Sequence, residues 1–202
     1  MDQLSLPTRQ NLILAKNNLA LSKQGYNLLD KKRQILLNEL SAQKENLTNL
    51  LNIIPGTFAR AYEALAQAKA FSAGKLFTQK PAVESTHRIH FSSRSVMGVE
   101  LPMLKLESLP YYPGPEDLWH TTVSYDKARR AWMEALKVIV KMAELQTTAT
   151  RLELALAKTQ KRAAALEHIL IPKYELQVKD ISRQLEEQER DGYSRVKAVT
   201  SY

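Results

Sequence analysis

The sequence predicts an all-α dominated protein, a long antiparallel two-helix coiled coil formed by the N- and C-terminal helices. A small central region contains a short helix and a β-hairpin. Apolar residues recur at heptad spacing near both ends of the chain. Only six of the 202 residues are glycine, and Leu, Ala, Lys, Gln and Glu dominate outside the centre, as is typical of long helices. We therefore expect three parts: residues 1–55, residues 56–125 and residues 126–202.

The N-terminal coiled-coil helix is expected to begin at Pro7-Thr8 and to run to Pro55-Gly56, which is a signal for a stop or a kink. Between these points apolar side chains hold most of two interleaved heptad series over six heptads. A seam of that length favours a coiled coil over an ordinary surface helix. The predicted seam residues are Leu12, Leu19, Tyr26, Leu29, Leu36, Leu40, Leu47 and Leu50.

The central region starts with a shorter helical pattern at about residues 58–73. Two β-leaning runs then flank a glycine and predict a hairpin over about residues 85–106, with its turn at Val96-Met97-Gly98-Val99. Pro102 belongs at an edge position, because proline cannot donate to a ladder. Residues 111–115 form a turn-rich connection to the C-terminal helix.

The C-terminal helix is expected from near Asp126 almost to the end of the chain. Its apolar stripe steps by four three times in succession from Leu166, which is a stutter that locally unwinds a supercoil. Pro172 lies at this change of phase and would bend the helix there; the alternative is a break into two separate helices. The predicted seam residues are Leu152, Leu156, Leu166, Leu170, Val178, Ile181 and Leu185.

The two apolar seams are expected to pair with each other. Neither stripe can stay exposed to water, and a compact centre between two terminal helices brings the helices together in opposite directions. The hairpin contributes little to either seam, so we expect it to be separable from the helices.

Several classes of function find no support in the residues. The chain has no cysteine, no signal peptide pattern and no apolar run long enough to span a bilayer, so a cytoplasmic protein is expected. The Gly74-Lys75 pair lacks the earlier glycine of a phosphate-binding loop, since Lys69 stands there. No catalytic residue, metal site or cofactor is predicted, and we expect a protein that is not an enzyme.

The formal net charge of +8 leaves two interpretations open, an acidic partner or a solvated helical surface that is basic. An RNA-binding coiled-coil arm would concentrate Lys and Arg on one face, whereas residues 126–202 mix fifteen basic with eleven acidic side chains. Narrow seams also differ from the wide apolar face of a membrane-surface helix. A coiled-coil adaptor, such as an export-apparatus stalk or an RNA-binding arm, is the alternative function.

Three stretches, in order along the chain, resemble the D subunit of V-type and archaeal A-type ATPases. The first is Leu6-Pro7-Thr8-Arg9, followed by Leu28-Leu29-Asp30-Lys31-Lys32-Arg33. The second is the hairpin sequence Ser93-Arg94-Ser95-Val96-Met97-Gly98-Val99-Glu100-Leu101-Pro102. The third comprises Arg162-Ala163-Ala164-Ala165-Leu166-Glu167, Ile171-Pro172, Leu185-Glu186-Glu187-Gln188-Glu189-Arg190 and Arg195-x-Lys197.

This resemblance implies a non-catalytic rotor shaft in the central stalk of a rotary ATPase or ATP synthase. It implies that the termini lie inside a ring of catalytic A and B subunits, that the F subunit binds the side of the stalk, and that the C subunit (d in eukaryotes) joins the shaft to the membrane rotor. One copy per complex, no nucleic acid and no direct membrane insertion are expected, with the complex peripheral to the membrane. Candidate ring contacts are Arg9, Arg162, Arg190, Arg195 and Lys197.

Overall fold

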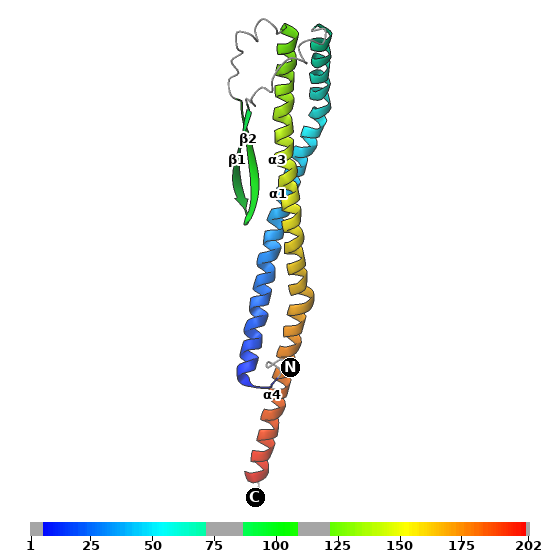
Figure 1. The fold of residues 1–202 in the computed structure, drawn as a ribbon. Helices are drawn as coiled ribbons and strands as arrows, with labels where there is room; N and C mark the ends of the chain where they lie inside the picture. Colours follow the sequence, from blue (N-terminus) through cyan, green and yellow to red (C-terminus); the bar gives the residue numbers. More distant parts are fainter. Residues whose placement is uncertain (1–5, 72–86, 109–121, 201–202) are drawn as a thin grey trace. The chain divides into compact units, whose positions relative to one another are not determined.

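The structure is a computed structural model that describes residues 6–71, 87–108 and 122–200 (Figure 1). Its elements are α1 (Arg9–Phe71), β1 (His87–Val96), β2 (Val99–Ser108), α3 (Val123–Ala165), a π-helical turn (Leu166–Leu170) and α4 (Ile171–Thr200). The predicted fold class is confirmed, with a long helix at each end of the chain and an antiparallel two-stranded hairpin between them. The turn-rich connection expected at residues 111–115 lies outside the described residues.

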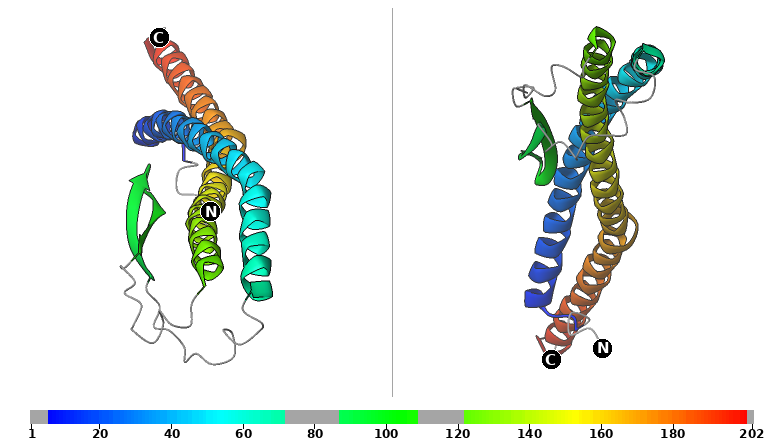
Figure 2. Two further views of the ribbon diagram at one scale, coloured as in Figure 1. Left: turned by 90° about the horizontal axis from the view of Figure 1, so that it is seen from above. Right: turned by 45° about the horizontal axis from the view of Figure 1, so that its top comes forward.

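The chain divides into two compact units, each containing part of both terminal helices. The first unit comprises residues 1–35 and 156–202, and the second comprises residues 36–155. In the first unit, Arg9 pairs with Glu189 and Lys23 pairs with Glu175, both at 2.7 Å between nitrogen and oxygen. In the second unit, Lys44 pairs with Glu153 at 2.7 Å. Partner numbers fall as numbers along α1 rise, so the helices are antiparallel within the first unit; Figure 2 shows both helices from two further directions.

Helix α1 begins at a threonine cap. The backbone N–H of Asn11 donates to the Thr8 hydroxyl at 3.2 Å, and the N–H of Leu12 donates to the Thr8 carbonyl at 3.0 Å. These bonds satisfy donors that have no partner within the first turn of a helix. The Pro7-Thr8 sequence therefore starts the helix where the sequence predicts it.

The helix does not end at Pro55-Gly56, and the separate short helix expected at about residues 58–73 is instead the last part of α1. Proline removes one helical hydrogen bond, here to the carbonyl of Leu51. Pro55 and Leu51 are both exposed, so water can reach that carbonyl. Beyond the proline, Ala61 and Ala68 are buried, and the rings of Phe58 and Tyr62 meet Trp132 of α3 edge-on, with ring centroids 6.2 and 5.2 Å apart. Packing against α3 thus continues the helix past a local stop signal.

The predicted seam side chains all lie on the sheltered side of their helices. Four of them are buried: Leu36, Leu40, Leu152 and Ile181. The remaining residues are half-buried, namely Leu12, Leu19, Tyr26, Leu29, Leu47, Leu50, Leu156, Leu166, Leu170, Val178 and Leu185. Each unit therefore has its own stretch of apolar seam.

The stutter near Pro172 is accommodated by the π-helical turn at Leu166–Leu170. The N–H of Ile171 donates to the carbonyl of Leu166, five residues back, so this turn holds one more residue than an α-helical turn. Both flanking residues, Ala165 and Ile171, keep right-handed helical angles. Residues 123–200 are consequently helical without interruption, and the alternative of two separate helices is wrong.

Pro172 is the second residue of α4, directly after the π turn. At the start of a helical segment a missing N–H costs little, and the fixed backbone angle of proline suits the helix. The wider turn before it also changes which carbonyl lies behind the proline ring. Pro172 therefore lies where a proline is tolerated without breaking the helix.

In the hairpin, Val96 pairs with Val99 around the two-residue turn Met97-Gly98. Both turn residues have positive φ, 50° for Met97 and 77° for Gly98, as a type I′ turn requires. Val96 and Val99 close the turn and exchange hydrogen bonds, so the alternation along an antiparallel ladder leaves Ser93 and Pro102 in a non-hydrogen-bonded pair. Pro102 therefore loses no ladder bond, because an N–H at this position would point outward.

We predict that deleting His168 converts the π turn into α-helix without disturbing the seam on either side. The π turn stores one residue beyond the α-helical count, and His168 is exposed. The midpoint of thermal unfolding, measured by circular dichroism, should stay equal or rise.

Deletion of Lys158 is the matched control, because Lys158 is also exposed but lies in regular α-helix. That deletion rotates all following side chains by about 100° around the helix axis and should lower the midpoint. Equal destabilisation by the two deletions would contradict the proposed role of the π turn.

Candidate interaction sites

The hairpin attaches to the helices of the second unit through one face of its turn-proximal half. Leu101 is 1% exposed and lines a recess together with Leu50 of α1 and Leu145 of α3. Arg94, which is paired with Leu101 across the ladder, donates to the Glu39 carboxylate of α1 at 2.6 Å. One buried leucine and one ion pair therefore hold this face against the helix pair.

The outer edge of β2 is bound by two side chains of α3. The N–H of Leu104 donates to a carboxylate oxygen of Glu144 at 3.0 Å, and the guanidinium of Arg151 donates to the carbonyl of Glu100 at 2.9 Å. Leu104 and Glu100 both belong to non-hydrogen-bonded pairs, whose N–H and C=O groups point away from the other strand. Side chains of α3 therefore satisfy edge groups of β2 that the ladder leaves free.

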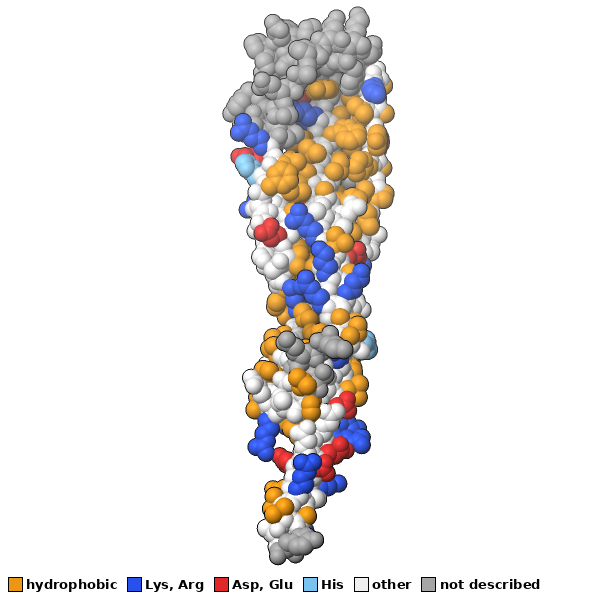
Figure 3. Space-filling view, turned by 60° about the horizontal axis from the view of Figure 1, so that its bottom comes forward, with side chains coloured by type: hydrophobic (Ala, Val, Ile, Leu, Met, Phe, Trp, Pro, Cys, Tyr) orange, Lys and Arg blue, Asp and Glu red, His pale blue; other side chains and the backbone are white. Residues whose placement is uncertain are grey.

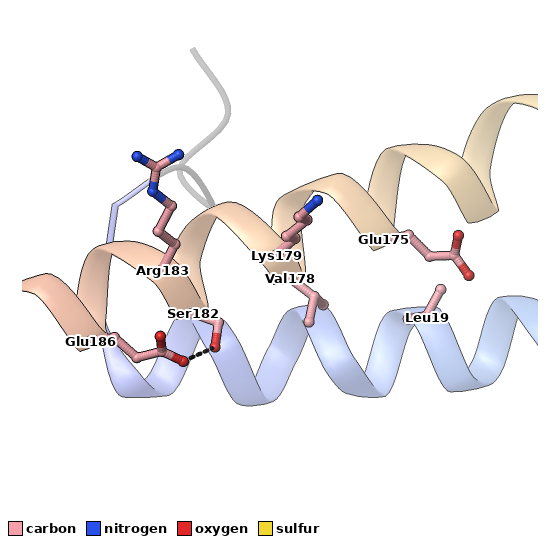
Figure 4. Close-up of a pocket in the computed structure, with 7 residues that line it drawn as sticks. All are labelled: Leu19, Glu175, Val178, Lys179, Ser182, Arg183 and Glu186. Atoms are coloured by element: carbon pink, nitrogen blue, oxygen red, sulfur yellow. Dashed lines mark hydrogen bonds between the residues drawn. The ribbon is translucent and has the colours of Figure 1, made fainter.

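A shallow groove in the first unit runs between α1 and α4. Leu19 of α1 and Val178 of α4 point toward each other, and Glu175, Lys179, Ser182, Arg183 and Glu186 line the α4 side (Figure 4). Ser182 lies at hydrogen-bond distance from Glu186, 3.5 Å, and Arg183 pairs with Glu187 at 3.1 Å. The groove is the rim of the helix seam, with polar side chains of both charges beside two apolar ones.

Tyr26 of α1 faces the π turn in the same unit. Its side chain hydrogen-bonds to Glu167. The negative charge of Glu167 raises the pKa of Tyr26 above its ordinary value of 10.0, and burial and the hydrogen bond act in the same direction. The neighbouring Gly25 lies beside Leu166, and a Cβ at this position would make an ordinary contact with Leu166 Cδ1 at 3.7 Å. A glycine, a tyrosine and the π turn thus meet at one level of the helix pair.

The five candidate ring contacts all lie in the first unit and are exposed. Arg9 is paired with Glu189, and Arg162 lies near the end of α3. The other three, Arg190, Arg195 and Lys197, belong to the end of α4. Every residue from 190 to 200 is exposed, and we call this segment the α4 tail.

The α4 tail extends past the start of its partner helix. Helix α1 begins at Arg9, which pairs with Glu189, so the α4 tail lies beyond the last of these contacts. Tyr193, Val196 and Val199 in the tail are exposed at 77%, 63% and 78%. Their spacing of three places them on one side of the helix, where the described part of the chain offers no cover.

Charge is spread over the surface. On the face in Figure 3, groups of Lys and Arg side chains alternate with hydrophobic ones and with acidic ones toward one end. Within residues 6–71, 87–108 and 122–200, no group of three His, Asp or Glu side chains could hold a metal ion. None of the helices in these same ranges is long and apolar enough to cross a membrane.

Two features of these sites escape sequence reasoning. The bonds from Glu144 and Arg151 to the edge of β2 join residues far apart in the chain and leave no periodic trace. The contact between Tyr26 and Glu167 likewise depends on the axial position of one helix relative to the other, although the stutter marks its location. In contrast, heptad spacing predicts the seam, and the two β-leaning runs that flank Gly98 predict the hairpin turn.

The fold defines a class of protein, an antiparallel helix pair with an attached hairpin. The chain belongs to the family of ATP synthase D subunits, whose profile matches residues 11–201. Members of this family are stalk components within an ATPase complex, so the chain is a component of that complex and partners other ATPase subunits.

Three relatives illustrate the similarity. The V-type ATP synthase D subunit of Thermotoga neapolitana is 33% identical, over 96% of this chain and 95% of the relative. The A-type ATP synthase D subunit of Methanobrevibacter smithii is 31% identical, over 96% and 86%. The A-type ATP synthase D subunit of Thermococcus sibiricus is 30% identical, over 96% and 92%. The likeness therefore extends over nearly the whole chain.

We predict that Leu101→Ala loosens the hairpin while both long helices remain formed. Truncating a fully buried leucine costs about 2–5 kcal/mol, and here the cost falls on attachment of the hairpin. Backbone amides of β1 and β2 should exchange with solvent faster, with unchanged helicity by circular dichroism. Leu106→Ala, at a half-buried position on the other face, should have a smaller effect. A large loss of helicity in Leu101→Ala would show that the hairpin holds the helices together.

We predict that Glu167→Gln lowers the pKa of Tyr26 toward 10.0, because it removes the charge that raises this pKa. The folded state favours neutral Tyr26, so this contribution to stability is present below pH 10.0 and is lost as the pH rises through the folded-state pKa. Nuclear magnetic resonance of carbon-labelled tyrosine, assigned with Tyr26→Phe, measures the pKa. Glu175→Gln, which removes the Lys23 partner instead, should leave it unchanged.

Proposed function

We propose that this chain is the central rotor shaft of a V/A-type ATPase or ATP synthase. It transmits torque between the catalytic ring of A and B subunits and the ion-translocating rotor of the membrane, without catalysing a reaction itself. One copy per complex lies in the central stalk, on the cytoplasmic side and peripheral to the membrane. The F subunit binds the side of this stalk, and the C subunit, called d in eukaryotes, joins the shaft to the membrane rotor.

The α4 tail is the observation that carries this proposal. A single helix that extends past its partner can be contacted from every side, as insertion into a surrounding ring requires, and the α4 tail offers apolar side chains on one side and basic ones elsewhere. Tyr193, Val196 and Val199 supply apolar contact area, and Arg190, Arg195 and Lys197 can pair with acidic groups of the ring. Arg9 and Arg162 add basic side chains in the same unit.

Antiparallel pairing supports the mechanical role. Two helices joined by an apolar seam resist twisting more than one helix, because relative sliding would take buried side chains such as Leu36 and Leu152 out of their contacts. A shaft built from two unequal helices also presents different side chains in different directions. Rotation of such a shaft would show each nucleotide site of the ring a different face in turn.

The test is reconstitution with a ring of purified A and B subunits, followed by measurement of ATP turnover. The isolated chain should hydrolyse no ATP, and its addition should change the turnover of the ring. Replacing Arg190, Arg195 and Lys197 together by Gln should reduce this effect several-fold. The matched control replaces Lys127, Arg130 and Lys137, three exposed cations of α3, and should retain the effect.

Two outcomes would count against the shaft. A variant that ends at Glu189 and still changes ring turnover as the full chain does would show that the α4 tail is not the inserted part. Turnover that purifies with the isolated chain and persists on repurification would make the chain an enzyme.

A further inference from the structure

The two outer edges of the hairpin differ. Side chains of α3 bind the edge of β2, and Pro102 removes one of its outward donors. Among residues 6–71, 87–108 and 122–200, no side chain binds the edge of β1 in this way, β1 itself contains no proline, and residues 88–95 are all exposed. In Figure 1, β2 lies between β1 and α3, so the free edge of β1 faces away from α3. An open strand edge is a template for another strand.

The register identifies the groups that this edge offers. Ile89, Phe91, Ser93 and Ser95 belong to non-hydrogen-bonded pairs, so the N–H and C=O of each residue point outward. The same alternation places Leu104 N–H and Glu100 C=O outward on β2, where both are bound by α3. Four residues of β1 can therefore each offer one donor and one acceptor to an added strand.

The side chains along β1 favour a particular partner chemistry. Ile89 and Phe91 share one face with Leu104 and Leu106, and Phe91 is 78% exposed. The opposite face of β1 carries Arg88, His90 and Arg94 and no acidic residue of β1 itself, although Arg94 already pairs with Glu39 of α1 and His90 contacts Glu107 of β2. A strand added to this edge would meet apolar side chains on one face and basic side chains on the other.

A second copy of this chain fits the edge poorly. Pairing β1 with another β1 would bring together two strands that each carry Arg88 and Arg94 and no carboxylate of their own. Like charges on directly opposed strand residues are destabilising. A partner strand with carboxylates at alternate positions would reverse the sign of this interaction.

We propose that the outer edge of β1 docks an extended segment of another protein of the ATPase complex, one that alternates apolar and acidic side chains. The added strand pairs with the outward groups of residues 89–95, covers Phe91 with its apolar side chains and places a carboxylate beside Arg88. The inference needs only membership of an ATPase complex and does not depend on torque transmission.

The experiment compares amide hydrogen exchange, at single-residue resolution, in the free full-length chain and in the assembled complex. Assembly should slow exchange at Phe91, Ser93 and Ser95 by about tenfold or more. The inward amides of Ser92 and Arg94, already bonded within the hairpin, should change little. Equally fast exchange of the outward amides in both states would overturn the proposal.

Ser93→Pro is the matched variant, because Pro102 already occupies the opposite position of the same pair. It removes one outward donor and no ladder bond, so Phe91 and Ser95 should return to fast exchange in the complex. Ser93→Ala keeps the donor and should behave like the unaltered chain. Protection of Ser92 and Arg94 in each free variant verifies that the hairpin has formed. Persistent slow exchange in a well-formed Ser93→Pro hairpin would overturn the proposal.

Phe91→Lys is a second variant, for the case in which proline disrupts the hairpin. It keeps every backbone donor but places a charge on the apolar face, so it should also abolish the slow exchange. Sedimentation of the free chain tests whether a second copy of this chain binds the edge instead. A dimer with slow exchange at Phe91 and Ser93 would show that a second copy binds this edge. That result would overturn the proposal that a segment of a different protein binds it.

Discussion

Two narrow apolar stripes, one on each terminal helix, have to stay in phase with each other within each unit. This constraint governs the rest of the structure. Each stripe covers only part of its helix, so an error of one residue would turn buried side chains such as Leu152 or Ile181 toward water. Where a helix is locally interrupted, its backbone therefore adjusts so that the two apolar stripes still face each other. At Pro55 the helix continues with one bond fewer, and at Leu166–Leu170 it takes up an extra residue in a wider turn.

The hairpin illustrates the opposite situation, because no stripe depends on it. It is attached by a few directed contacts: Leu101 in its recess, Arg94 on Glu39, and two bonds from α3 to β2. Such contacts fix the orientation of a small sheet without adding to the helix seam. The chain belongs to the family of ATP synthase D subunits, and its hairpin is attached so that the edge of β2 is bound by α3 while the edge of β1 is exposed.

The sequence predicts those parts of the structure that depend on the spacing of apolar residues along the chain. Heptads predict both long helices, alternation around Gly98 predicts the hairpin, and the stutter locates the change of phase before Pro172. The predicted end of α1 is wrong, because a proline is a strong local signal and the packing of Phe58 and Tyr62 on Trp132 is a tertiary one. The form of the phase change does not follow from spacing either. A stutter can be absorbed by unwinding, bending or a π turn, and the hydrogen bond of Ile171 decides between them.

The unequal ends of the helix pair have a geometric consequence for the proposed shaft and for the ring that would enclose it. A single α-helix with its side chains is about 10–12 Å across, whereas two packed helices have axes about 8–10 Å apart and are nearly twice as wide in one direction. Around residues 190–200 a close-fitting sleeve needs a round bore of one helix, and beside Arg9 and Glu189 it needs an oval one. A round bore allows turning at constant clearance, while an oval shaft in a fitted hole pushes its walls apart as it turns. In the proposed shaft, the tip of α4 would therefore act as a bearing pivot and the paired region as a cam.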